Sequence, residues 1–242
     1  MARRGQVTLF IILAIVIAAI SLIIFFVVKE RQKIALEQQA KIQEIRAFIR
    51  DCLTDALNQT EKDICFNGFY YKAYNNSILY FLTAVPYFYK NKTIAIPKLE
   101  QIENEFSQTL IENIGKCLNN FSQFETEGID VLWNYSLNTK IKEGSIAIMT
   151  SPIAIKKDNF ITSFSLSLEK KSELDHLYLA LKEIIEGYNN EQGFLCIDCL
   201  DDISTKYNVT IQINSLFTPT GEGAYIVRII KEDLSLRFAM EV

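Results

Sequence analysis

Histidine is nearly absent from this sequence of 242 residues, in which His176 is the single example. This scarcity argues against most histidine-based metal sites and against a Ser-His-Asp triad. Glycine (9 residues) and proline (4 residues) are also rare, and 49% of the residues are apolar, so collagen-like and disordered classes are excluded. The 25 basic residues do not outnumber the 29 acidic ones, which argues against a nucleic-acid partner.

A long apolar run occupies the N-terminal part of the chain. From Val7 to Val28 only Thr8 and Ser21 are polar, and no charged residue occurs. As a helix this run spans roughly 33 Å, enough to cross the hydrocarbon core of a bilayer. A cleaved secretory signal is disfavoured because the run is too long and ends in charged residues instead of a small-residue cleavage site. We therefore expect a transmembrane helix over residues 6–28, with the lipid bilayer as a partner.

Sequence motifs for N-glycosylation place the remainder of the chain outside the cell. The basic residues on the two flanks of the apolar run are nearly balanced, so the flanks alone do not indicate which end of the run lies in the cytoplasm. Six Asn-x-Ser/Thr motifs exceed what composition predicts by chance, although an accident in an asparagine-rich chain stays open. We expect a single-pass protein of the cell membrane, with a cytoplasmic N-terminus and an extracytoplasmic C-terminal domain. The candidate glycosylation sites are Asn58, Asn75, Asn91, Asn120, Asn134 and Asn208.

The first residues follow a distinctive order: Arg3-Arg4, then Gly5-Gln6, then the apolar run. Over roughly 30 residues this start resembles archaeal type IV prepilins. The resemblance implies that a prepilin-type peptidase cuts after Gly5, that Gln6 becomes the mature N-terminus, and that copies of the chain pack through their N-terminal helices. The acidic residue of bacterial pilins is missing, because Phe10 stands at that position. An ordinary basic flank on a membrane anchor is the alternative.

The expected fold class is α+β, with a long N-terminal transmembrane helix that continues into an ectodomain of mainly antiparallel sheet plus two or three helices. Apolar residues recur at helical spacing from Ile42 to Leu57, which predicts an amphipathic continuation of the first helix; a break near 37–41 is the alternative. The expected organisation is a basic leader at 1–5, a transmembrane helix at 6–28, an amphipathic helix extension at 29–57 and an extracytoplasmic α+β domain at 58–242.

Periodicity beyond residue 58 alternates between the patterns of strands and helices. The segment 66–89 is rich in aromatic residues. It forms either a platform for a glycan or partner or, as we favour, a strand pair packed on the long helix with Tyr hydroxyls reaching water. A hairpin turn is expected at Asn91-Lys92. We expect further helices from Pro97 to Cys117 and from Ser172 to Tyr188. The expected strands are 131–137, 145–149, 160–168, 209–213, 224–230 and 234–240.

Five cysteines are candidates for disulfides, and their connectivity cannot be deduced from sequence. Cys52 and Cys117 lie on apolar faces of predicted helices and either bridge them or fill the core. The Cys196-Ile-Asp-Cys199 spacing suits a redox pair or half of a zinc site. Acidic neighbours disfavour a thiolate, and no second Cys/His pair completes a metal site, so a structural disulfide or buried thiols are favoured. The candidates are Cys52, Cys65, Cys117, Cys196 and Cys199.

No catalytic constellation emerges from the sequence. Gly221-Glu-Gly223 is too short for a phosphate loop and suits a turn, and His176 lies near a helix start without a nucleophile at a recognisable spacing. We therefore expect no enzyme activity, catalytic residue, cofactor or metal. The expected function is that of a membrane-anchored cell-surface protein resembling a pilin-like filament or pseudopilus subunit. A non-assembling single-pass envelope protein with a binding or adhesive ectodomain is the alternative.

Overall fold

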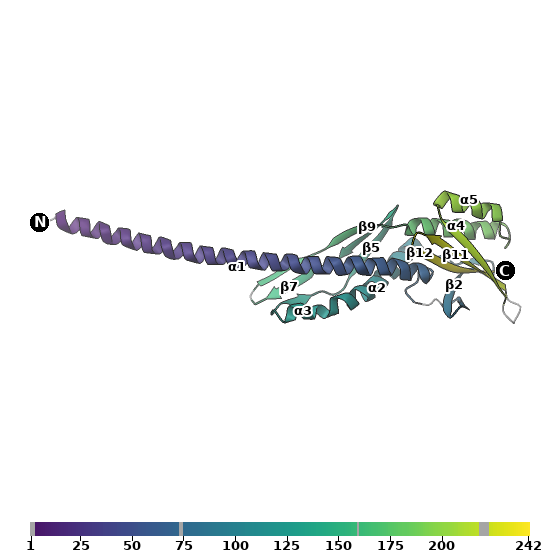
Figure 1. Ribbon diagram of the computed structural model, residues 1–242, viewed down its shortest axis with the longest axis horizontal. Coiled ribbons are helices and arrows are strands. Elements are labelled where there is room, and N and C mark those ends of the chain that lie inside the picture. The colour runs from purple at the N-terminus through teal and green to yellow at the C-terminus, as the bar shows by residue number, and fades with distance from the viewer. Residues whose placement is uncertain (1–2, 73–74, 159, 218–222) are drawn as a thin grey trace. The chain divides into compact units, whose positions relative to one another are not determined.

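The computed structural model describes residues 3–72, 75–158, 160–217 and 223–242 (Figure 1). Within the first helix, side chains are described from Val16 onward, except at positions 19, 31, 34 and 35. The chain divides into two compact units, Met1–Ile49 and Arg50–Val242, which are treated separately below. Helices make up 47% of the structure and strands 32%, so the α+β class is confirmed.

Helix α1 (Arg3–Phe66) begins in the first unit and ends in the second. It is continuous through residues 37–41, so the alternative of a break there is wrong. Polar residues follow the apolar run directly, starting with Lys29 and Glu30. The expected amphipathic face continues into the second unit, where Leu53 and Leu57 are fully buried.

The prediction of a transmembrane helix at 6–28 is wrong. Among the residues searched, which are those that the structure describes, none of the helices contains a stretch long and apolar enough to cross a membrane. The described apolar side chains lie between Val16 and Val28, and the charges of Lys29 and Glu30 follow at once.

The C-terminal end of α1 is closed by a Schellman motif. The N–H of Phe69 donates to the carbonyl of Ile64 at 2.7 Å, and the N–H of Gly68 donates to the carbonyl of Cys65 at 3.1 Å. Gly68 has φ +65°, and a Cβ built there would approach Pro86 Cγ at 2.4 Å and the Arg237 carbonyl oxygen at 2.9 Å. Only glycine satisfies both the left-handed backbone and this close approach.

A methyl group at Gly68 is therefore expected to destabilise the second unit. The left-handed conformation costs an alanine about 1–2 kcal/mol, and overpacking adds about 1–3 kcal/mol, so Gly68→Ala should lower the free energy of unfolding by roughly 2–5 kcal/mol. The measurement is denaturant unfolding followed by circular dichroism. Gly115→Ala in α2 is the matched control, because a Cβ there meets nothing within 4 Å and should be neutral or stabilising. Equal effects of the two substitutions would contradict this account.

The largest sheet of the second unit has six strands in the order β1-β2-β12-β11-β10, with β3 added to β2. All neighbours are antiparallel except β12 and β2, which run parallel. The predicted turn at Asn91-Lys92 is confirmed, because it joins β2 and β3. The strands are β1 (Ser77–Tyr80), β2 (Thr83–Lys90), β3 (Thr93–Ile94), β10 (Thr210–Phe217), β11 (Gly223–Lys231) and β12 (Leu234–Glu241).

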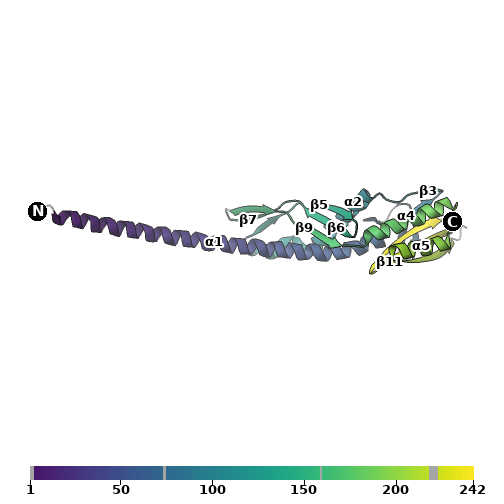
Figure 2. The same ribbon diagram turned by 90° about the horizontal axis from the view of Figure 1, so that it is seen from above.

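Helices α4 (Leu174–Asn190) and α5 (Ile197–Tyr207) lie beside this sheet (Figures 1 and 2). The ring of Tyr188 in α4 packs edge-on against Tyr89 at 5.0 Å between centroids and against Tyr225 at 6.2 Å. Phe88 stacks on Phe238 at 5.6 Å, and both are fully buried. The aromatic residues of β2 therefore form core instead of an exposed platform, although their ring partners lie on α4 and β12 and Phe81, also in segment 66–89, is 84% exposed.

Two three-stranded antiparallel sheets complete the second unit. Helix α2 (Leu99–Leu118) packs on the sheet that contains residues 137–142. There its buried Glu103 accepts hydrogen bonds from the Ile141 N–H at 3.0 Å and from Lys140 Nζ at 2.7 Å. The first sheet has the order β4 (Asp130–Leu132), β7 (Ile153–Lys157) and β8 (Phe160–Phe164). The second has the order β5 (Leu137–Lys142), β6 (Ser145–Thr150) and β9 (Ser167–Lys171). A short 3₁₀ turn and α3 (Ser122–Glu125) follow α2.

Two expected strands are each divided between these sheets. Residues 160–168 form the end-to-end strands β8 and β9, because the chain leaves one sheet at Phe164 and enters the other at Ser167. Thr150 holds this crossing by accepting the Leu166 N–H on its hydroxyl at 2.9 Å and donating its own N–H to the Leu166 carbonyl at 2.9 Å. Residues 131–137 likewise contribute to both β4 and β5.

Candidate functional site

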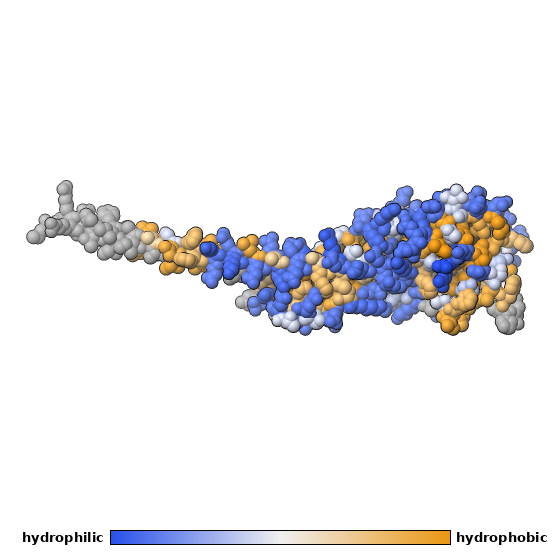
Figure 3. All heavy atoms as spheres, viewed as in Figure 1, coloured by the Kyte–Doolittle hydropathy of each residue, from blue (hydrophilic) through white to orange (hydrophobic). Residues whose placement is uncertain are grey.

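The segment Val16–Val28 of α1, called the apolar segment below, exposes a run of apolar side chains, seen in Figure 3 as the orange stretch next to the grey atoms. Its ten large apolar side chains are 46–63% exposed. The exposed positions are consecutive from Leu22 to Val28, and seven residues make almost two helical turns, so apolar side chains cover every side of the helix. A helix that is apolar all round has to be covered by something else.

The expected leader-processing residues, Gly5 and Gln6, have their backbone inside α1, while their side chains lie outside the described part of the structure. Met1 and Ala2 also lie outside it. Cleavage after Gly5 therefore stays a prediction.

Two disulfides confirm that the cysteines form bridges. Cys52 of α1 is joined to Cys117 of α2, and Cys196 is joined to Cys199 at the start of α5. Cys52 is buried, but Cys117 is exposed, so only Cys52 lies on an apolar core face. Cys65 is a buried free thiol. Burial, together with the nearby negative charges of Glu61 and Asp233, raises the pKa of the Cys65 thiol far above its usual range, so it is inert as a nucleophile.

All six candidate glycosylation residues are exposed, and none of them belongs to a buried core. Asn91 and Asn208 occupy left-handed turns, with φ of 51° at each, and Asn120 has φ 52° after α2. Asn58 is different because it lies in the middle of a helical stretch of α1. Their glycosylation stays a prediction.

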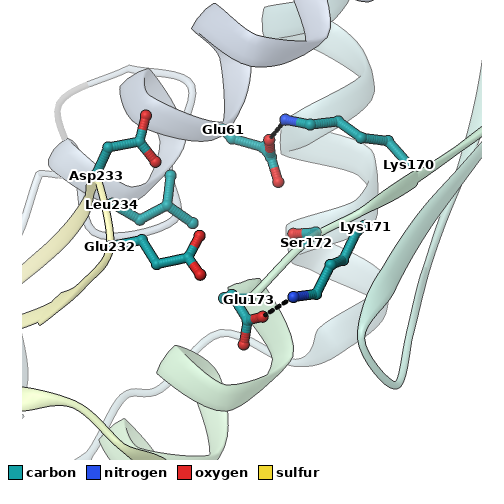
Figure 4. A pocket seen from close by; sticks show the side chains of 8 residues that line it. All are labelled: Glu61, Lys170, Lys171, Ser172, Glu173, Glu232, Asp233 and Leu234. Atoms are coloured by element: carbon teal, nitrogen blue, oxygen red, sulfur yellow. Dashed lines mark hydrogen bonds and ion pairs between the residues drawn. The ribbon is translucent and has the colours of Figure 1, made fainter.

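A cleft of about 230 Å³, called the polar cleft below, lies in the second unit (Figure 4). It is formed by the last turns of α1, the connection between β9 and α4, and the turn between β11 and β12. Its lining residues are Glu61, Lys170, Lys171, Ser172, Glu173, Glu232, Asp233 and Leu234.

Glu61 enters the polar cleft from α1 and is only 3% exposed. One carboxylate oxygen pairs with Lys170, while among the described residues no polar group bonds the other, Oε1, which is also buried. Across the cleft, Asp233 pairs with Lys62 at 2.7 Å. This hydrogen bond, more than the Coulombic attraction of Lys62, holds the pKa of the Asp233 carboxyl below its usual range.

Glu173 is the centre of the charge network on the other side of the cleft. Its Oε2 lies 2.8 Å from His176 Nδ1 and 3.2 Å from Lys231 Nζ, and its Oε1 lies 3.4 Å from Lys171 Nζ. Lys231 is itself buried and donates to the Tyr207 carbonyl at 2.6 Å. Burial acts to raise the pKa of Glu173, but the hydrogen bonds with His176, Lys231 and Lys171 and the charge of Lys231 outweigh it and lower the pKa to about 2.

This network should make the stability of the second unit depend on acid pH. The ordinary pKa of the carboxyl is 4.5 and its folded-state value is about 2. The ionised form is thus favoured by folding, so the stabilisation is fully present above pH 4.5 and is lost as the pH falls from 4.5 to 2. We expect a loss of about 2 kcal/mol over this interval, and Glu173→Gln should flatten it. Lys231→Met should move the loss to higher pH. Chemical unfolding at a series of pH values measures both, and an unchanged slope in Glu173→Gln would contradict the assignment.

The acidic and basic side chains of the polar cleft largely pair with each other. Among the described residues, no group of three or more His, Cys, Asp or Glu side chains is arranged to hold a metal ion. The cleft therefore joins three distant stretches of chain through ion pairs, and nothing in it forms a nucleophile–base pair.

Sequence reasoning did not find the polar cleft, because its residues come from three stretches far apart in the chain; Glu61 and Lys170 alone are 109 positions apart. The only local signal is the i, i+3 spacing of Glu173 and His176 on α4. His176 lies near the start of α4, as expected, and its partners there are Glu173 and Lys231, which the sequence did not indicate.

Comparison of the chain with known protein families, with characterised proteins and with solved structures finds no match to any of them.

Proposed function

We propose that this chain is a subunit of a pilin-like filament or pseudopilus at the cell surface, in which the apolar segments of several copies pack against one another. The observation that carries the proposal is the apolar segment itself, which is helical, apolar on all sides and exposed over its described length. Packing against other copies buries every side of such a helix at once, which docking on one face of a folded domain does not.

The energetics favour multiple partners. Completing the burial of one half-exposed Val, Leu, Ile or Phe contributes about 1 kcal/mol, so ten of them contribute on the order of 10 kcal/mol per copy. Association of two proteins costs an estimated 4–15 kcal/mol in lost freedom. Contact with a single neighbour would use only part of the surface, whereas a bundle uses all of it. The proposal is therefore an assembly of many copies and not a dimer.

The N-terminal order Arg3-Arg4-Gly5-Gln6 supports the same proposal. Two arginines next to an apolar helix would add unpaired charge to the interior of a bundle, and a charge in an apolar surround costs about 2.5–3.5 kcal/mol on insertion scales. Removal of the leader by a prepilin-type peptidase lowers this cost. The peptidase is thus the second partner that we propose, after copies of the chain itself.

An extracytoplasmic position of residues 50–242 is part of the proposal. Disulfides persist in oxidising compartments, and this unit contains two of them. Its exposed sequons are available to a glycosylation system, as expected for a surface protein.

The processing step is tested on protein purified from its native host. We expect intact mass and N-terminal sequencing to show a chain that begins at Gln6, and Gly5→Leu to retain the leader and to remain unassembled. A native chain that still begins at Met1 or Ala2 would contradict processing.

A second candidate function is supported by a separate observation. The β1–β2 hairpin ends in Phe81 and Leu82, which are almost fully exposed and both have positive φ, 44° and 64°. Bulky residues are unfavourable in a tight turn of this kind, where Asn and Gly are preferred. Such a strained apolar tip fits a non-assembling envelope protein with a binding or adhesive head. Loss of binding to its host surface in Phe81→Asn/Leu82→Gly, with a monomeric native protein, would favour this candidate.

A further inference from the structure

The disulfide between Cys196 and Cys199 lies at the N-terminus of α5, which packs beside α4 (Figure 1). Cys196 is the N-cap residue, and Cys199 is in the first turn. The Cys199 side is exposed, and Cys196 is half-buried. The assembly function proposed above does not use this bond, and its three-residue separation means that it constrains the chain far less than the bond between Cys52 and Cys117 does.

The two sulfur atoms have different surroundings. Cys196 Sγ accepts a hydrogen bond from the Cys199 N–H at 3.2 Å, and it lies where the free N–H groups of α5 point. Negative charge that develops on Cys196 is therefore stabilised by the helix N-terminus. Cys199 has no such bond among the described contacts and is the more accessible atom. In thiol–disulfide exchange, the accessible sulfur is attacked and the better stabilised thiolate leaves.

Exposed apolar side chains flank the disulfide. Phe194 precedes it and is 74% exposed, and Ile197 lies between the two cysteines and is 69% exposed. Asp198, Asp201 and Asp202 surround the same turn with negative charge and are all exposed. These carboxylates repel small anionic thiols such as glutathione, whereas the apolar pair offers a contact surface to a protein.

We propose that Cys196–Cys199 is a thiol–disulfide exchange site whose partner is the dithiol of a protein oxidoreductase that docks on Phe194 and Ile197. The partner's thiolate attacks Cys199 Sγ, a new S–S bond forms between the two proteins, and the Cys196–Cys199 bond breaks with Cys196 leaving as the thiolate. The partner's second thiolate then attacks its own bridged sulfur and releases Cys199. The chain gains two electrons, the partner becomes a disulfide, and both new thiolates take protons from solvent.

In this exchange the pair is the substrate: the exposed disulfide is attacked at Cys199, and Cys196, at the N-terminus of α5, is the leaving thiolate. The inference is independent of filament assembly, because every residue that it uses belongs to residues 194–202 and none to the apolar segment.

The test uses the full chain and, as the probe, a thioredoxin-fold dithiol protein whose second cysteine is replaced by serine, so that the mixed disulfide cannot resolve. Peptide mass mapping should place the adduct on Cys199, with the Cys52–Cys117 bond intact. Phe194→Ser and Ile197→Ser should each slow adduct formation about tenfold, while reduction by the small neutral dithiol dithiothreitol stays unchanged. Ile161→Ser is the matched control, because Ile161 is an equally exposed apolar side chain on β8.

Three results would overturn the proposal. An adduct on Cys196, or equally on Cys117, would remove the assigned direction of attack. No adduct under conditions in which dithiothreitol opens the bond would remove the protein partner. Equal rates in Phe194→Ser, Ile197→Ser and Ile161→Ser would remove the docking surface. Circular dichroism of each variant shows that the fold is kept, so that a lost adduct reports exchange and not unfolding.

Discussion

Replacing Ile24 by glutamate is expected to prevent assembly of the chain. Ile24 lies inside the apolar segment, and its neighbours one helical turn away include the exposed apolar residues Ile20, Val27 and Val28. A carboxylate placed in a bundle of such helices costs about 2.5–3.5 kcal/mol per copy, which lowers the association constant about 100-fold for each contact. Because each copy in an assembly meets several others, the loss multiplies. Sedimentation should show a shift from large assemblies to single chains.

The matched control is Leu36→Glu. Leu36 is also an exposed apolar residue of α1, at 67% exposure, but it lies beyond the apolar segment, and its neighbours one helical turn away include the polar residues Gln32, Lys33 and Gln39. This variant should assemble as the native chain does. Equal loss in both variants would show that the whole helix takes part, and no loss in Ile24→Glu would show that the apolar segment does not carry assembly.

Removing the Cys52–Cys117 disulfide is expected to produce the largest loss of stability. The bond closes a sequence separation of 65 residues, which corresponds in the chain-entropy model to about 4 kcal/mol, against about 2 kcal/mol for the separation of 3 between Cys196 and Cys199. The double variant Cys52→Ala/Cys117→Ala should therefore unfold at a midpoint about 10 °C lower. The double variant Cys196→Ala/Cys199→Ala should lower the unfolding midpoint by half as much or less.

Differential scanning calorimetry compares the two double variants directly. Cys52 is buried, and alanine is smaller than cysteine, so part of the lost stability in the Cys52→Ala/Cys117→Ala variant comes from poorer packing of the core. Reducing the Cys196→Ala/Cys199→Ala variant separates the two contributions, because Cys52–Cys117 is then the only disulfide among the described residues, and reduction opens it without removing either side chain. An equal shift for both double variants would contradict the assignment of Cys52–Cys117 as the main covalent constraint.

The helices with a clear apolar stripe could be predicted from the sequence. The expected helix over Pro97–Cys117 corresponds to α2, and that over Ser172–Tyr188 corresponds to α4, because large apolar residues recur along one face of each. Helix α5 was missed, since it is short and acidic and Ile203 is its single buried residue. The turn between residues 160 and 168 was also missed, because apolar and polar residues keep alternating where the chain passes from one sheet to the next.

The candidate sites were predicted only in part. Presence of disulfides followed from the cysteine count, but the pairing depended on which helices lie side by side. The polar cleft depends on Glu61, Glu173 and Asp233 meeting in space, and nothing in their local sequence shows that. The transmembrane prediction rested on the length of the apolar run in the sequence, whereas among the described residues no helix is long and apolar enough to cross a membrane.

Photocrosslinking from the apolar segment tests the central claim most directly. A photoreactive phenylalanine analogue at Phe25 replaces one exposed aromatic ring by another, so the helix is little changed. Assemblies are formed from equal parts of unlabelled and ¹⁵N-labelled chains, irradiated and digested. We expect mixed-isotope adducts between Phe25 and residues 16–28 of another copy. Adducts only with lipid, only with peptides from residues 50–242, or only within one copy would contradict the account.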